Sequence, residues 1–196
     1  MISKLAKSIA HFFVVQNITE ESKEVIYAYG MELLISDVLN TIIVLLIALF
    51  SHTLPAVVVF IAVFMGLRQF VGGFHANSHL SCMFTLVMVM MVFSYGICNV
   101  SGHITPIFSI SFIMIALPII LCIAPVPHPN KPMSEEKNVK LRKRSCILAV
   151  TLSVVTIALL VFQYQKLSLY VSSGMLLSAI MALLGHFLNR GDNSKR

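Results

Sequence analysis

Six apolar runs constrain the fold of this chain more than any other feature. They cover about residues 31–50, 54–67, 80–98, 104–124, 145–162 and 167–188. A helix needs about 20 apolar residues to cross the hydrocarbon core of a bilayer. The run at 54–67 reaches only about 21 Å at about 1.5 Å per residue, unless its helix continues toward Phe70. The pattern predicts an all-α integral membrane protein with about six transmembrane helices.

Composition supports the same class. Of the 196 residues, 58% are hydrophobic and 11% are charged, and the mean hydropathy is +0.90. Soluble domains carry about 25% charged residues. We therefore expect one transmembrane helical domain over residues 1–196. The four cysteines (Cys82, Cys98, Cys122 and Cys146) show no paired spacing that would indicate a disulfide framework.

Basic residues gather at alternate ends of the apolar runs. With six spans and a cytoplasmic N-terminus, only Lys166 of the 14 Lys and Arg residues falls outside, which leaves 14 − 1 = 13 inside. This agrees with the positive-inside rule and places both termini in the cytoplasm. The net charge of +6 therefore indicates contact with anionic lipid headgroups rather than with nucleic acid.

Two segments outside the spans have patterns of their own. Residues 1–18 resemble an amphipathic helix in the cytoplasmic interface, although a helix facing the bundle core fits nearly as well. Thr19 is a possible cap for a second helix, with Glu20 and Glu21 in its first turn. Residues 125–144 form the longest polar segment, in which prolines exclude a helix at the start and Ser134 with Glu135 and Glu136 can open a short helix before the basic residues.

The most polar short segment between two spans runs from Arg68 to Cys82. It contains Gly72, Gly73, His75 and His79. Polar side chains near lipid are costly and usually functional. With both termini inside, this segment lies at the cytoplasmic face.

The first interpretation of this segment is a Cys–His dyad. His75 would act as the base that turns Cys82 into a thiolate, because a free thiol titrates only near pH 8.5. Seven residues on one unbroken helix are about 10.5 Å apart along its axis, which is too far for proton transfer. The dyad therefore requires His75 to leave the helix, and the neighbouring glycines allow that.

Two other interpretations stay open from the residues alone. His75, His79 and Cys82 at positions i, i+4 and i+7 of a continuous helix are possible transition-metal ligands, although no fourth ligand is evident. The segment is otherwise a structural interfacial loop, in which the histidines reach toward water and Cys82 is a small core residue.

The order Leu67-Arg68, Gly72-Gly73, His75-Ala76 and Cys82 resembles the signature of the accessory gene regulator protein B family, which are bacterial membrane cysteine peptidases. A second match runs from Ala124 to Val126 and from Pro129 to Pro132, and a third from Tyr29 to Glu32. The length, the hydrophobic layout and the basic loop also resemble this family over nearly the whole chain.

This resemblance implies a function. Cys82 would be the nucleophile and His75 the general base of an endopeptidase in the bacterial cell membrane, without a cofactor. The substrate would be the precursor of a cyclic autoinducing peptide, whose C-terminal part is removed before the rest is cyclised to a thiolactone or lactone. The resemblance also implies a homodimer. Separately, Gly174 marks a possible close contact between helices.

Four further residues are candidates for supporting roles. We expect Arg68 to act as a charge clamp, and Gly72 and Gly73 to present backbone N–H groups to an oxyanion or to position substrate. Asp37 and Glu32 are candidates to orient His75 or to pair with Arg68, because a carboxylate inside a span is costly unless paired. A plain packing role is the alternative for both acids.

Two functions without catalysis compete with the peptidase. Glu32, Asp37 and Arg68 near the bilayer, with the glycine pair, are compatible with a small-solute transporter. The internal repeat that many transporters contain is not evident in this sequence. A membrane scaffold is the other alternative, and it predicts that substitution of Cys82 or His75 has no effect.

Overall fold

The computed structural model describes residues 2–72, 79–126 and 135–193, and every element in this part of the chain is helical, which confirms the all-α class. The elements are α1 (Ile2–Val15), η1 (Glu21–Lys23), α2 (Glu24–Phe50), α3 (Leu54–Val71), α4 (His79–Met91), η2 (Val92–Gly96), η3 (Ile97–Asn99), α5 (Thr105–Ile123), α6 (Glu135–Val161) and α7 (Gln165–Asn193). Here η2 is a π-helix, whereas η1 and η3 are 3₁₀-helices.

Five of these helices are long and apolar enough to cross a membrane, among the residues described: α2, α3, α5, α6 and α7. The helix α3 has 18 residues, so it covers about 27 Å and extends past Leu67, as the sequence required for a span. The third apolar run is divided between α4, η2 and η3, and its apolar part, Val87–Asn99, is shorter. Five spans are therefore supported by length and composition, against about six predicted.

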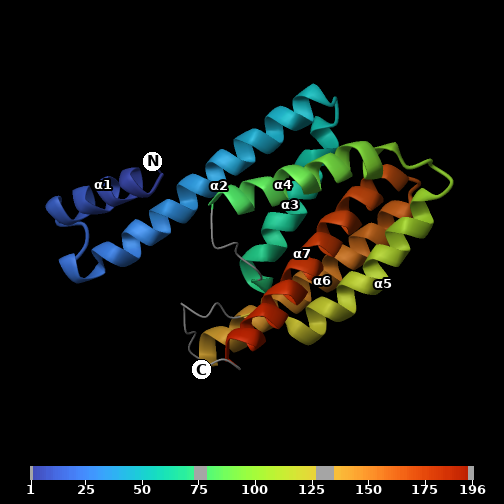
Figure 1. Cartoon of the computed structure of the whole chain (residues 1–196). Coiled ribbons are helices and arrows are strands. Elements are labelled where there is room, and N and C mark those ends of the chain that lie inside the picture. Colours follow the sequence, from blue (N-terminus) through green and yellow to red (C-terminus); the bar gives the residue numbers. More distant parts are fainter. Residues whose placement is uncertain (1, 73–78, 127–134, 194–196) are drawn as a thin grey trace.

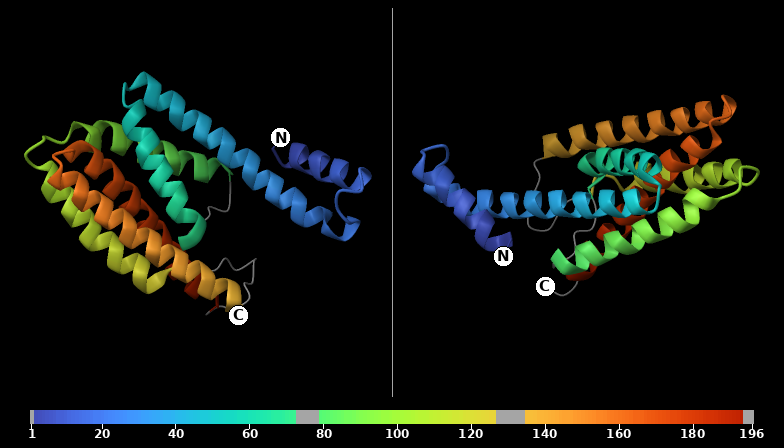
Figure 2. Two further views of the ribbon diagram at one scale, coloured as in Figure 1. Left: turned by 180° about the vertical axis from the view of Figure 1, so that it is seen from behind. Right: turned by 90° about the horizontal axis from the view of Figure 1, so that it is seen from above.

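Successive helices alternate in direction, so their ends collect at two poles of the bundle (Figures 1 and 2). The turns after α2, η3 and α6 lie at one pole, which we call the turn pole. The ends of α3 and α5 and the starts of α4 and α6 lie at the other, which we call the motif pole. The residues from Arg68 to Gly72 and from Ala124 to Val126 therefore come to the same end of the molecule.

Three helices end in the same way. Asn17, His52 and Gln163 have positive φ angles of 54°, 56° and 65°. The N–H of the residue after each one bonds back over five positions, as in Thr53 N to Ala48 O at 2.9 Å. This is a Schellman ending, which satisfies the last carbonyls of a helix and reverses the chain. It closes α1, α2 and α6 before their turns.

Two groups of buried side chains hold the helices together. The group nearer the turn pole joins α2, α3 and the α4–η2 segment through Val44, Phe60, Met90 and Phe93. The rings of Phe60 and Phe93 have centroids 4.3 Å apart. The turn between α2 and α3 is also connected to η2, since the hydroxyls of Thr53 and Ser94 are 3.2 Å apart.

The second group lies toward the motif pole and joins α3, α5, α6 and α7. Its members are Leu67, Val71, Ala116, Ile120, Ala124, Val126, Ala149, Met175, Ala179 and Ala182. Many are alanines, which allow helices to approach closely where no water is present to drive association. Through Leu67 and Val71, the last turns of α3 pack against α5, α6 and α7.

The N-terminal segment forms a helical hairpin with α2, beside the bundle (Figure 1). The predicted helix is present, and it buries Ala6 and Ala10. His11 Nδ1 lies 3.4 Å from Glu24 Oε1, and the Phe13 and Tyr27 rings meet edge to face. The neighbour of this helix is thus the first half of α2.

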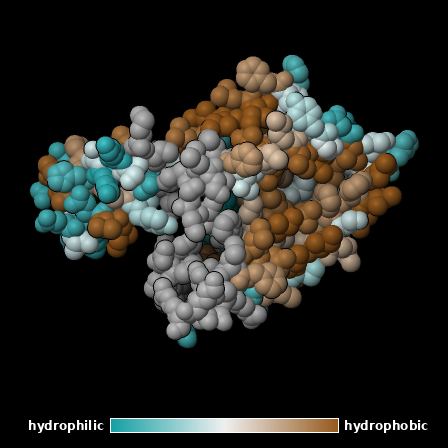
Figure 3. All heavy atoms as spheres, viewed as in Figure 1, coloured by the Kyte–Doolittle hydropathy of each residue, from teal (hydrophilic) through white to brown (hydrophobic). Residues whose placement is uncertain are grey.

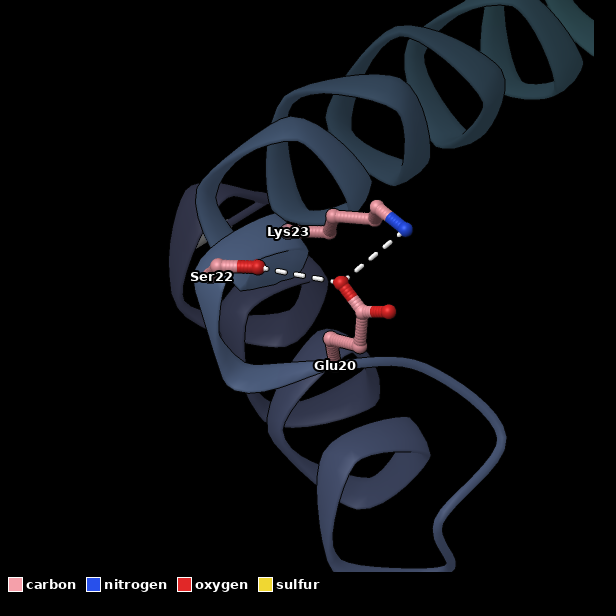
Figure 4. A network of polar contacts seen from close by, with 3 residues as sticks. All are labelled: Glu20, Ser22 and Lys23. Atoms are coloured by element: carbon pink, nitrogen blue, oxygen red, sulfur yellow. Dashed lines mark hydrogen bonds and ion pairs between the residues drawn. The ribbon is translucent and has the colours of Figure 1, made fainter.

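The turn between α1 and α2 differs from the predicted cap. Glu20, not Thr19, precedes the short η1 helix. The carboxylate of Glu20 accepts a hydrogen bond from Ser22 Oγ at 3.3 Å and pairs with Lys23 Nζ at 3.1 Å (Figure 4). A local acid therefore organises the turn.

The helix expected to open near Glu135 in the polar segment 125–144 is present, but it is not short. The helix α6 begins at Glu135 and continues without a break to Val161. Glu135 and Glu136 lie in its first turn, where the helix dipole favours acids, and Glu136 pairs with Lys140 one turn later. No glycine or proline follows Pro132 in this stretch. The basic residues therefore extend the apolar run at 145–162 as one continuous helix.

The surface of the bundle is mostly apolar, whereas hydrophilic residues gather over α1 and the start of α2 and at the turn pole (Figure 3). Exposed apolar residues on α5 and α6 include Ile107, Ile110, Met114, Ile147, Val154 and Ile157. A soluble monomer rarely exposes such a continuous apolar area. The surface fits a lipid environment.

Candidate functional site at the motif pole

The end of α3 presents Arg68 and Gly72 at the motif pole. Arg68 lies in the last turn of α3, half-buried, with its guanidinium carbon 5.5 Å from the centroid of the Phe64 ring. A ring face at this distance stabilises a cation and fixes its direction. Arg68 thus holds a positive charge at the end of α3, where the helix dipole also favours one.

Gly72 ends α3 in a conformation that favours glycine. Its φ of 72° and ψ of −151° fall in a region that other residues essentially do not adopt. Its N–H donates to Arg68 O at 3.0 Å. This amide therefore closes the last turn of α3, and the oxyanion role expected of Gly72 stays a prediction.

The residues after α5 lie directly against this glycine. Val126 N–H donates to Val71 O at 2.9 Å, and Gly72 and Val126 form an isolated parallel β-bridge. We call this contact the Gly72–Val126 bridge. It joins the two segments that carry most of the family resemblance, although they lie far apart in the sequence.

The two proposed catalytic residues fall differently. Cys82 belongs to the first turn of α4, which begins at His79, but its side-chain placement is not described. Gly73 and His75 lie in 73–78, outside the described residues.

The two candidate acids lie on α2, which packs against α4. Glu32 is half-buried, and the side chain of Asp37 is outside the described part. Ser36 and Asn40 were not expected to matter, yet they are 7% and 8% exposed. Their four-residue spacing from Glu32 was the available signal, since it aligns all three along a helix. The buried face of α2 is thus polar toward its N-terminal half.

The basic residues of the polar segment 125–144 lie in the first three turns of α6, whose start is at the motif pole (Figure 1). Arg142, Lys143 and Arg144 are exposed, while Lys140 pairs with Glu136. We call Arg142, Lys143 and Arg144 the basic turn of α6. A positive surface therefore lies at the same pole as the end of α3.

Within residues 2–72, 79–126 and 135–193, no group of three or more His, Cys, Asp or Glu side chains is placed to hold a metal ion. A ring-supported cation, a glycine held by a backbone bridge and exposed basic residues of α6 lie at the motif pole, while Cys82 lies in the first turn of α4. An anionic thiolate is favoured in the first turn of a helix. The arrangement is suited to a nucleophilic cysteine.

Comparisons with known proteins show which family the chain resembles. Residues 3–182 match the family model for AgrB, accessory gene regulator B. A protein of Clostridium beijerinckii described as AgrB-like is 25% identical over 145 residues, which cover 72% of this chain and 71% of that protein. No solved structure matches the chain significantly.

The family match extends over all the segments on which the resemblance was noted, from Tyr29 to Pro132, and over most of the bundle. Among the described residues, it also covers four apolar helices of membrane-spanning length and most of a fifth. The chain therefore belongs to the accessory gene regulator B family, and this membership supports a part in the processing of quorum-sensing peptides.

Proposed function

We propose that this protein is a cysteine endopeptidase that removes the C-terminal part of a small quorum-sensing precursor peptide and promotes its cyclisation. The observation that carries the proposal is the family match over residues 3–182, which includes the Arg68–Cys82 segment. Cys82 is the nucleophile and His75 the general base.

The proposed reaction has two transfers. His75 takes the proton of the Cys82 thiol, and the thiolate sulfur bonds to the carbonyl carbon of the scissile peptide. The C–N bond then breaks, and the protonated His75 gives its proton to the leaving amine. The product is an acyl-enzyme thioester, while the C-terminal fragment departs with a free amine.

The second transfer closes the ring. A thiol of the bound peptide attacks the thioester carbonyl, and Cys82 leaves as a thiolate. One thioester replaces another, so the step needs no further energy source. A substrate hydroxyl would give a lactone by the same route. Water would give a linear acid, so a site sheltered at the membrane face favours cyclisation.

Three polar elements of the motif pole support the chemistry. Arg68, held over Phe64, is placed to pair with a carboxylate of the substrate or of the protein. Asp37 and Glu32 are proposed to orient His75 or to pair with Arg68. The bridge at Gly72 fixes the point where Gly73 and His75 follow α3 in the chain.

The basic turn of α6 is the proposed docking surface for the precursor and for anionic lipid. Exposed Arg142, Lys143 and Arg144 would attract an acidic C-terminal segment of the peptide. The proposal includes a multi-pass orientation in the bacterial cell membrane with both termini and the motif pole in the cytoplasm, which requires α4, η2 and η3 together to make a sixth crossing beside the five long helices. A homodimer is part of the proposal, on the family resemblance alone.

The experiment is a cleavage assay on the full chain in lipid vesicles, with the co-encoded precursor as substrate and mass analysis of both products. Cys82→Ala and His75→Ala are expected to abolish cleavage while folding is retained. Cys146→Ala, a half-buried cysteine on α6, is the matched control and should cleave normally. Unchanged cleavage by Cys82→Ala would exclude the peptidase.

A further inference from the structure

At the Gly72–Val126 bridge, the backbone of Val126 lies so close to Gly72 that no side chain fits between them. A Cβ atom on Gly72 would lie 2.5 Å from Val126 O and 3.5 Å from Val126 C. Both neighbours are backbone atoms, so no side-chain rotation could relieve the overlap. Only a glycine fits here, because of the space as well as the φ angle.

Each side of the bridge is anchored in the core. Val71 is fully buried and Val126 is 6% exposed, and both belong to the buried group toward the motif pole. Ala124 N–H donates to Ile120 O at 3.0 Å, which ties the residues before Val126 to the last turn of α5. The bridge is therefore a rigid contact between the ends of two helices.

The bridge lies at the point where the chain leaves α3 toward the proposed catalytic segment. Gly72 directly precedes Gly73 in the motif, and His75 follows two residues later in the sequence. On the other side, Val126 precedes the connection to the basic start of α6. A displacement of Val126 would therefore change where the motif segment leaves α3.

We propose that the Gly72–Val126 bridge is a positioning device for the reaction at Cys82, so that turnover depends on the backbone of a residue after α5. The inference rests on the proposed peptidase function. It assigns Gly72 and Val126 a role in placing the catalytic segment rather than in contacting substrate.

The first test compares Gly72→Ala with Gly66→Ala in the vesicle assay. Gly66 lies on the same helix, and nothing lies within 4 Å of its added Cβ. We expect Gly72→Ala to lower kcat at least about tenfold, because small displacements of reacting groups have large effects on rate, with KM within about twofold. Gly66→Ala should match the wild type. A wild-type kcat for folded Gly72→Ala would overturn the inference, as would an effect confined to KM.

A second variant covers failure of Gly72→Ala to fold. Replacing the amide of Val126 by an ester removes the N–H that donates to Val71 O and leaves all side chains intact. We expect kcat to fall in this variant as well. A wild-type kcat in folded ester protein would contradict a positioning role for the bridge.

A measurement independent of turnover separates this inference from the peptidase proposal. Amide hydrogen exchange of the peptide covering residues 121–126 should be faster in Gly72→Ala than in Gly66→Ala and the wild type. If exchange is faster in Gly72→Ala but the wild-type protein does not cleave the precursor, the contact between Gly72 and Val126 is upheld and the peptidase proposal is rejected. Unchanged exchange in Gly72→Ala would reject the bridge while leaving the peptidase intact.

Discussion

The backbone of Gly174 on α7 lies against the carbonyl oxygen of Phe60 on α3. A Cβ atom at Gly174 would lie 2.9 Å from that oxygen and 3.0 Å from Val63 Cβ. One turn later, Ser178 Oγ donates to Gly174 O at 3.0 Å and reaches Phe64 O at 3.4 Å. Close approach through small residues is the usual basis of helix packing in membranes, and it confirms the helix contact predicted at Gly174.

Substitution of Gly174 tests this contact. We expect Gly174→Ala to lower the free energy of unfolding by about 1–3 kcal/mol, because α3 and α7 must move apart. Gly66→Ala should instead raise it by up to about 1 kcal/mol through helix propensity. Unfolding in mixed micelles measures both values. Equal stability of the two variants would contradict the close contact.

A buried hydroxyl pair links α5 and α7. Ser109 Oγ and Ser168 Oγ are 3.0 Å apart, and Ser168 donates to Gln165 O at 2.7 Å. Ser109 is therefore the donor to Ser168. A double-mutant cycle with Ser109→Ala and Ser168→Ala should give a coupling energy of about 0.6 kcal/mol.

Ser153→Ala supplies the control for that cycle. Ser153 donates to Ala149 O within its own helix, so its combination with Ser109→Ala should be additive. Additivity of the Ser109 and Ser168 variants themselves would mean that the hydrogen bond contributes no measurable stability.

The basic turn of α6 should govern precursor affinity. Reversal of Arg142, Lys143 and Arg144 to Glu is expected to raise KM about tenfold, since three exposed charges contribute about 0.5 kcal/mol each and about 1.4 kcal/mol is a factor of ten. Added salt should raise the KM of the wild type in the same direction. Lys166→Glu, near the turn pole, is the control.

An unchanged KM in the triple variant would remove the docking role and leave the cluster to membrane topology. An equal effect from Lys166→Glu would show that net charge, rather than this surface, controls binding.

Asp37 on α2 is the acid proposed to orient His75. Asp37→Asn should lower kcat for cleavage about tenfold or more, because an unoriented His75 is a poorer base. Glu32→Gln serves as the comparison on the same helix. Cleavage at the wild-type rate by folded Asp37→Asn would remove Asp37 from the mechanism.

Much of the fold follows from sequence patterns that are local. Long apolar runs predict α2, α5, α6 and α7, and the need to span a bilayer predicts that α3 extends past Leu67. The short range of these signals also explains the errors. The length of α6 depends on basic residues that resemble a loop in composition, and the π-helix η2 interrupts the third apolar run without a distinctive sequence signal.

The candidate site divides in the same way. Family resemblance marks Arg68, Gly72 and Cys82 from the sequence. The bridge between Gly72 and Val126 could not be predicted, since it joins distant segments through backbone atoms that carry no residue preference on the Val126 side. Burial of Ser36 and Asn40 likewise depends on how α2 packs against its neighbours, which periodicity alone does not determine.

The central claim is that Cys82 carries the acyl group of the precursor during turnover. The direct measurement is intact-mass analysis of the wild-type protein in vesicles, quenched in acid soon after mixing with precursor, followed by peptide mapping. We predict a mass increase equal to the N-terminal precursor fragment, mapped to Cys82, sensitive to hydroxylamine and absent from Cys82→Ser. Precursor cleavage without any adduct on Cys82, or with the adduct on another residue, would contradict the account.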